Sequence, residues 1–110
     1  MGRQFSKMDI EIFNKLAPEA GGNLNSEMGH PYPFILRPIS HRIAESSEDF
    51  KQRIERLNAE ELDYLIDLAL KGEEDVRSLD PEDIDAFTDV IEEKISAERA
   101  KELRLGIGIV

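Results

Sequence analysis

The sequence contains no cysteine. Without thiols the chain can form no disulfide, has no thiolate nucleophile and offers no thiolate ligand to zinc. Cysteine-free sequences suit a reducing compartment, and we expect a cytoplasmic protein. Long apolar runs are missing too, because the stretches at 33–36 and 105–110 fall far short of the roughly 20 residues that a membrane helix needs. The first twelve residues carry acids where a secretory signal has an apolar stretch, so we expect neither export nor contact with a membrane.

Basic side chains are in the minority. The chain has 14 lysine and arginine residues against 24 aspartate and glutamate residues, a formal net charge of −10. Residues 58–95 hold fourteen of the acids against Lys71, Arg77 and Lys94, which gives this segment a charge of −11. Such a field repels phosphate, so we expect no nucleic-acid partner. Hydrophobic residues make up 40% of the 110 positions, enough for one folded globular domain.

What the sequence does contain is a repeated signal for the start of a helix. An apolar residue precedes a capping residue, an acid follows three positions later and another apolar residue four positions later. The pattern occurs at residues 5–10, 57–62 and 79–84, with Ser6, Asn58 and Asp80 as the capping residues. It combines a capping box with a hydrophobic staple. The sequence therefore predicts an all-α fold, a small bundle of about five short helices.

The expected organisation follows from apolar spacing and from proline. Helix one covers residues 6–17 and ends before Pro18. Residues 18–45 hold four of the five prolines and are predicted to be irregular, with room for a brief extended piece at residues 34–36. Residues 46–104 are predicted to form the helical core.

Within that core we expect four helices, starting after Ser46 or Ser47, Asn58, Asp80 and Ser96. The helices that start after Asn58 and Asp80 are expected to pack antiparallel. The C-terminal stretch, residues 105–110, alternates apolar residues with glycine and is expected to dock, without helical structure, in a groove of its own fold or of a second copy. This stretch and the short chain suggest a homo-oligomer, most simply a dimer.

Two groups of residues are candidates for function. The irregular segment contains aromatic, imidazole and guanidinium side chains that can present a binding surface, namely His30, Tyr32, Phe34, Arg37 and His41. The acidic half offers a surface for a basic protein partner, with candidates Glu73, Glu74, Asp75, Glu82 and Asp85. No spacing of ligands indicates a metal site, and we expect no cofactor and no catalytic residue.

The composition and motifs favour a non-catalytic module for protein–protein interaction or regulation that associates with itself. The alternative is a small enzyme or ligand-binding subunit whose site lies in residues 27–42, where Glu27 joins the imidazoles. His30 and His41 are eleven positions apart with no helix predicted between them, so the sequence alone does not bring them together.

Overall fold

The structure is a computed structural model that describes residues 5–20 and 34–108. These residues form an all-helical fold without strands, as the sequence predicts. The elements are α1 (Lys7–Leu16), η1 (Pro18–Ala20), α2 (Leu36–Pro38), η2 (Ile39–Ile43), α3 (Ser47–Ile54), α4 (Ala59–Leu70), α5 (Pro81–Lys94) and α6 (Ala97–Gly106). The radius of gyration is 12.8 Å, close to the roughly 13 Å expected of a compact chain of this length.

Two of the three predicted capping boxes are present. At α1, Ser6 Oγ accepts the Asp9 N–H at 3.2 Å, and the Asp9 carboxylate accepts the Ser6 N–H at 2.7 Å. At α4, Asn58 and Glu61 exchange the same pair of bonds at 2.8 and 2.9 Å. Each box satisfies N–H groups that a helix start leaves without partners. The helix starts at residues 6 and 58 are therefore encoded locally.

The third predicted box is wrong. Asp80 precedes α5 but makes no capping bond through its side chain. Asp83, the expected reciprocal partner, is 4% exposed and accepts a hydrogen bond from Ser40 of η2 instead. Pro81 at the first helical position still supports the start of α5, because its missing N–H is one that no helix could satisfy there. Tertiary contact has replaced the local cap.

Residues 36–43 are helical, contrary to the prediction of an irregular segment with an extended piece. Glu74 explains the change, because its carboxylate accepts the backbone N–H groups of Ile35 at 2.9 Å and Leu36 at 2.9 Å. This carboxylate acts as an N-terminal cap supplied from a distant part of the chain. Pro38 fits because it lies in the first turn, where no N–H is required. The turn then widens, and Ala44 N–H donates to the Ile39 carbonyl five residues back at 2.8 Å.

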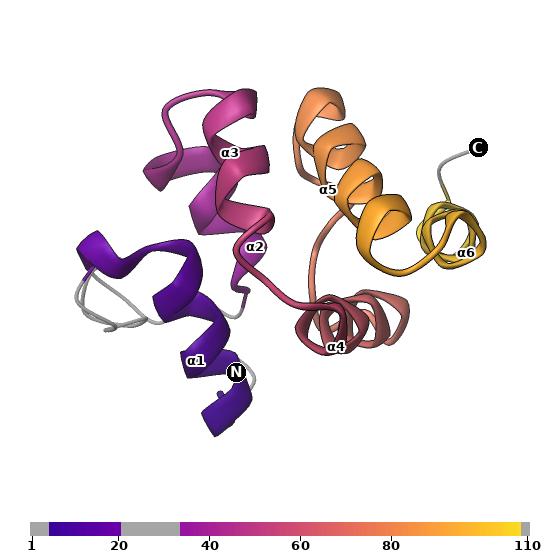
Figure 1. Ribbon diagram of the computed structural model, residues 1–110, viewed down its shortest axis with the longest axis horizontal. Helices are drawn as coiled ribbons and strands as arrows, with labels where there is room; N and C mark the ends of the chain where they lie inside the picture. The colour runs from indigo at the N-terminus through magenta and orange to yellow at the C-terminus, as the bar shows by residue number, and fades with distance from the viewer. Residues whose placement is uncertain (1–4, 21–33, 109–110) are drawn as a thin grey trace.

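The predicted antiparallel packing of the helices that follow Asn58 and Asp80 is also wrong. Figure 1 shows α4 nearly end-on, whereas α5 runs downward close to the plane of the page, so the two helices are not antiparallel. The main neighbours of α5 are α3 and α6. The connection between α4 and α5 buries Val76 and Leu79, which ties it to the core and turns the chain before α5 begins.

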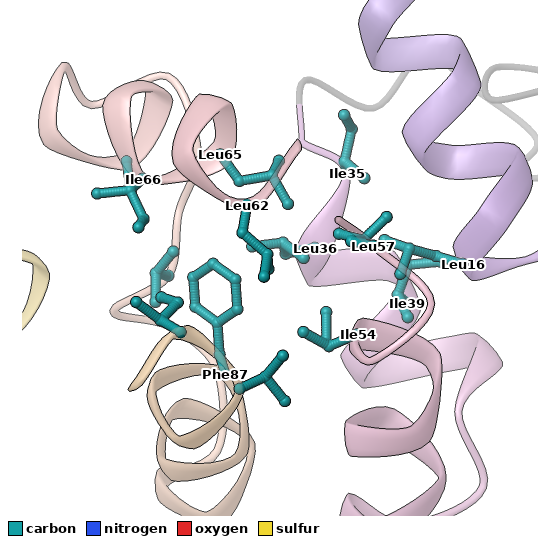
Figure 2. Close-up of a cluster of buried hydrophobic side chains, with 14 of the residues drawn as sticks. Leu16, Ile35, Leu36, Ile39, Ile54, Leu57, Leu62, Leu65, Ile66 and Phe87 are labelled. Carbon is teal, nitrogen blue, oxygen red and sulfur yellow. The ribbon is translucent and has the colours of Figure 1, made fainter. Parts of the chain in front are cut away.

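The core lies where α3, α4, α5 and the α2–η2 segment meet (Figure 2). The ring of Phe87 from α5 points between Leu62 of α4 and Ile54 of α3, and all three side chains are fully buried. Each such side chain contributes roughly 1.5–3 kcal/mol through removal of apolar surface from water. This shared core gives α5 a fixed position on one side and leaves its opposite face to solvent.

The C-terminal stretch departs from the prediction for residues 105–110. Helix α6 continues through Leu105 and Gly106. Gly106 lies close to Leu70, because a Cβ at position 106 would be 2.1 Å from Leu70 Cδ2 and would force that side chain to move. Ile107 packs partly against the core, whereas Leu105 remains 57% exposed. Residues 109 and 110 lie outside the described residues.

Candidate functional site

The exposed face of α5 carries a row of acids. We call Glu82, Asp85, Asp89, Glu92 and Glu93 the acidic stripe, and all five are exposed. Their spacing of 3, 7, 10 and 11 residues from Glu82 places them on one side of a helix, opposite the side that buries Phe87. Asp85 pairs with Arg104 of α6 at 2.6 Å. In the part of the chain that the structure describes, the other four carboxylates have no ion pair and no side-chain hydrogen bond.

This arrangement is unfavourable for the isolated helix. Like charges repel across three or four residues of a helix, and the stripe contains such pairs at 85 and 89 and at 89 and 93. Glu92 and Glu93 also lie in the last turn of α5, where the helix dipole disfavours negative charge. The stripe is therefore a region of uncompensated negative potential held on a well-packed helix.

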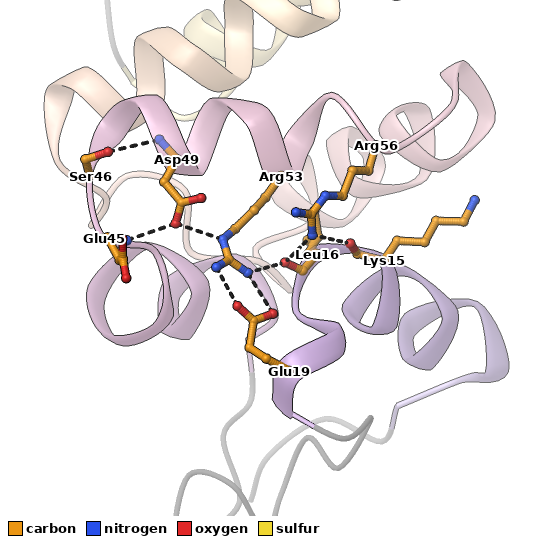
Figure 3. A network of polar contacts seen from close by, with 8 residues as sticks. All are labelled: Lys15, Leu16, Glu19, Glu45, Ser46, Asp49, Arg53 and Arg56. Carbon is orange, nitrogen blue, oxygen red and sulfur yellow. Dashed lines mark hydrogen bonds and ion pairs between the residues drawn. The ribbon is translucent and has the colours of Figure 1, made fainter.

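Elsewhere several basic side chains bind internal partners, most clearly Arg53 (Figure 3). Its guanidinium, buried at 6% exposure, binds both carboxylate oxygens of Glu19 at 2.6 and 3.0 Å and Asp49 at 3.0 Å. A further bond of 2.7 Å reaches the Leu16 carbonyl at the end of α1. We call Arg53 and these partners the Arg53 cluster; it ties α3 to the α1–η1 corner.

The Arg53 cluster shifts the titration of its members. Hydrogen bonds from Arg53 lower the pKa of Glu19 from 4.5 to about 2. A hydrogen bond from the Glu45 backbone, together with Arg53, lowers the pKa of Asp49. In return, the bond to Glu19 raises the pKa of Arg53 above its ordinary value. All three groups are thus charged across the neutral range, and the single cation of Arg53 lies between two carboxylates.

A second arginine neutralises acids of α4. Arg99 of α6 binds Asp63 and Asp67 at 2.7 Å each and Glu102 at 2.9 Å. Burial opposes its charge, but hydrogen bonds to Asp67, Asp63 and Glu102 outweigh burial and raise the pKa of Arg99. Asp63 and Asp67 of α4 thus share a cation, whereas Asp89, Glu92 and Glu93 of the acidic stripe have no ion pair in the described residues.

The five acids predicted to form a partner surface differ in exposure, and their role in binding stays a prediction. Glu82 and Asp85 belong to the acidic stripe, and Glu73 is exposed in the α4–α5 connection. Asp75 pairs with Arg37 at 3.7 Å. Glu74 is 3% exposed and caps α2, so it is not part of any surface. The prediction omitted Asp89, Glu92 and Glu93, which the helical spacing of the acids could have identified.

The predicted binding residues in the former irregular segment serve the fold where the structure describes them. Arg37 pairs with Asp75, and His41 Nε2 contacts the Ser78 carbonyl at 3.2 Å. Both interactions fasten the α2–η2 segment to the α4–α5 connection, at separate points. Phe34 lies at the edge of a groove, described next. Glu27, His30 and Tyr32 lie outside the described residues, so a ligand site in 27–42 stays a prediction.

Three adjoining hollows mark the surface around the end of α6. The largest, the terminal groove, has a volume of about 410 Å³ and is lined by Phe34, Leu70, Lys71, Val76, Arg77 and Ile107, among others. The second, about 360 Å³, is lined by Arg77, Leu79, Ile84, Asp85 and Arg104, among others. The third, about 170 Å³, lies between α5 and α6 and is lined by Thr88, Asp89, Glu92, Lys101 and Arg104, among others. Because Arg77 and Arg104 are each shared by two hollows, the three form one continuous surface.

Comparisons of the chain with protein-family models, with curated proteins and with solved structures found no match. Within residues 5–20 and 34–108, no group of three or more histidine, aspartate or glutamate side chains is placed to hold a metal ion. In the same residues, no helix is long and apolar enough to cross a bilayer. The fold defines an all-helical protein, and its most distinctive described feature is the acidic stripe.

Proposed function

We propose that this chain is a non-catalytic protein-interaction module that binds partners through the acidic stripe of α5. The observation that carries the proposal is that four of the five stripe carboxylates have no ion pair and no side-chain hydrogen bond in the described residues, whereas the acids around Arg53 and Arg99 each pair with a guanidinium. Repulsion along α5 costs stability, and a basic partner relieves that cost only when bound. The partner expected on these grounds is a protein with a cationic surface.

A stripe of this kind acts mainly on the rate and selectivity of association. Opposite charges steer two proteins toward the correct encounter, and like charges disfavour wrong partners. Because the carboxylates are exposed, their effect is screened by salt over about 10 Å at 0.1 M ionic strength. The packed core beneath α5 holds the stripe in one arrangement, which reduces the ordering cost of binding. We also propose that the module is cytoplasmic, as the cysteine-free sequence suggests.

The test compares capture by three immobilised proteins. One is the wild type, one is the stripe variant Glu82→Gln/Asp89→Asn/Glu92→Gln/Glu93→Gln, and the third is a control, Glu11→Gln/Glu48→Gln/Glu60→Gln/Glu98→Gln. The control removes the same number of charges from exposed acids on α1, α3, α4 and α6 that have no ion pair and no side-chain hydrogen bond among the described residues. A cell extract is applied at roughly 0.15 M ionic strength and eluted with rising salt.

The proposal predicts one or more basic proteins that the wild type and the control capture and that the stripe variant loses. Their elution by moderate salt would show that exposed charges hold them. Equal capture by all three proteins would contradict the proposal and reduce the stripe to a feature that aids solubility.

A further inference from the structure

The end of α6 repeats a turn that the chain also forms at the end of α4. After α4, Gly72 has a φ of +81° and donates its N–H to the Ala69 carbonyl at 3.1 Å. The next N–H, that of Glu73, returns to the Leu68 carbonyl at 2.8 Å. A left-handed glycine with these two bonds is a Schellman motif, which ends a helix and folds the following residue back over the last helical turn.

Gly108 starts the same motif after α6. Its φ is +84°, and its N–H donates to the Leu105 carbonyl at 3.2 Å, the counterpart of the first bond after α4. In this motif the second bond joins the N–H of the next residue to the carbonyl one position earlier, here Arg104. That next residue is Ile109, which lies outside the described residues. The motif therefore directs Ile109 back toward the last turn of α6.

An open apolar hollow lies where this turn directs the chain. The second hollow, of about 360 Å³, is lined by Gly108 itself and by the apolar side chains of Leu79, Pro81 and Ile84. The Cα of residue 109 is about 3.8 Å from that of Gly108, so it is within reach of this lining. At the same place after α4 the chain has an exposed acid, Glu73, whereas here it has an isoleucine.

The charged residues of the second hollow are compatible with an apolar occupant. Asp85 and Arg104 pair with each other at 2.6 Å. Arg77 is exposed, and its guanidinium lies beside the turn, since its Nη1 would be 3.7 Å from a Cβ on Gly108. The remaining side chains of the described lining are apolar. The hollow thus leaves apolar surface for which an isoleucine is a suitable partner.

We propose that Ile109 of the same chain occupies the second hollow and fastens the end of α6 to the start of α5. The turn at Gly108 gives the direction, and burial against Leu79 and Ile84 gives the favourable free energy. Helix α6 is then held at both ends, because Arg99 in its first turn already binds two acids of α4. The four stripe residues changed in the capture test are not among the described lining of this hollow, so the two proposals are tested independently.

The test determines the position of Ile109 directly by NMR. The methyl groups of isoleucine and leucine are isotope-labelled in the full chain, and nuclear Overhauser effects from the Ile109 methyl groups are measured. We expect such effects between Ile109 and the methyl groups of Leu79 and Ile84. A mixture of labelled and unlabelled copies, measured with isotope filtering, separates contacts within one chain from contacts between two copies.

Thermal unfolding measures the energetic consequence. Ile109→Ala should lower the melting temperature by about 5 °C, because a buried apolar side chain is truncated. Leu105→Ala is the matched control, since it truncates a leucine that is 57% exposed at the same end of the molecule. It should change the melting temperature by about 1 °C or less.

A second pair of variants tests the turn. Gly108→Ala strains the left-handed residue, so it should turn the chain away and abolish the Overhauser effects from Ile109. Gly72→Ala places the same strain after α4, where a Cβ meets nothing within 4 Å. It should lower the melting temperature through strain and retain the effects from Ile109.

A wild type without Overhauser effects from Ile109 to Leu79 or Ile84 overturns the inference. Effects that arise only between two copies also overturn it, because the occupant is then a second chain. So does an Ile109→Ala variant with the melting temperature of the wild type, or a Gly108→Ala variant that keeps the effects.

Discussion

The Arg53 cluster and the acidic stripe use charged side chains in opposite ways. In the Arg53 cluster, a buried guanidinium lies within 3.0 Å of two carboxylates and also binds a carbonyl at the end of α1. In the stripe, only Asp85 of the five carboxylates has an ion pair among the described residues, with Arg104. The first arrangement holds two parts of the fold together. The second adds repulsion that the described residues do not offset, so the chain separates charges that stabilise it from charges that are free to bind a partner.

The largest expected effect on stability follows from removing the guanidinium of Arg53. Arg53→Ala leaves Glu19 and Asp49 without their cation and removes a cap from α1, so we expect the free energy of unfolding to fall by about 3 kcal/mol. Urea unfolding measures the loss. Arg99→Ala is the comparison, because the Arg99 side chain is more exposed than that of Arg53, 16% against 8%, and all three of its acids are more than half exposed, whereas Asp49 is 25% exposed. It should cost about 1 kcal/mol. Equal losses of unfolding free energy in the two variants would show that the deeper burial of Arg53 adds nothing to stability.

The second prediction concerns how the stabilising effect of Glu19 in the Arg53 cluster depends on pH. Glu19 has a pKa of about 2 in the fold against 4.5 in the unfolded chain, so its stabilising effect is complete above pH 4.5 and is lost as the pH falls toward 2. The carboxylate is 55% exposed, so after solvent screening we expect the effect to be about 1 kcal/mol. The difference in stability between wild type and Glu19→Gln should therefore be constant near neutrality and should shrink below pH 4.5. A difference that persists to pH 2 would show that the ionised carboxylate is not its source.

The smallest effect has the opposite sign. Neutralising the end of the stripe with Asp89→Asn/Glu92→Gln/Glu93→Gln relieves repulsion, so the free energy of unfolding should rise by about 0.5 kcal/mol. The rise should be largest near 0.01 M salt and almost absent at about 1 M salt, where charges are screened over about 3 Å. Thermal unfolding, at a protein concentration low enough to keep the chain monomeric, measures both. A loss of stability at low salt would mean that these acids have intramolecular partners after all.

The parts of the fold that the sequence could predict are those encoded within a few residues. Four helices start where the sequence predicts, each with a capping side chain that accepts the backbone N–H three residues further on. The capping residues are Ser6, Ser46, Asn58 and Ser96. The failures have long-range causes. Glu74 caps α2 across 38 residues, and Ser40 draws Asp83 away from Asp80 across 43. A sequence pattern reports neighbours along the chain and carries no information about these partners.

The candidate site follows the same division. Acids with helical spacing could be assigned to one face of α5 from the sequence, because helical geometry alone decides it. Their lack of partners could not, since that depends on where Arg53, Arg99 and Arg104 lie in space. Likewise, the apolar alternation at 105–110 pointed to a groove, but the structure continues α6 through Leu105 and Gly106, and the closeness of Gly106 to Leu70 is a contact between distant parts of the chain.

The cap that Glu74 provides has a consequence for the order of assembly. A helical turn of residues 36–38 is too short to persist alone, since the first turn of a helix is the costly one to form. Its amides find their acceptor only when the connection between α4 and α5 has already taken its final course. We therefore expect the turn of α2 to form together with or after that connection, and a change at Glu74 to leave the N–H groups of Ile35 and Leu36 without this acceptor.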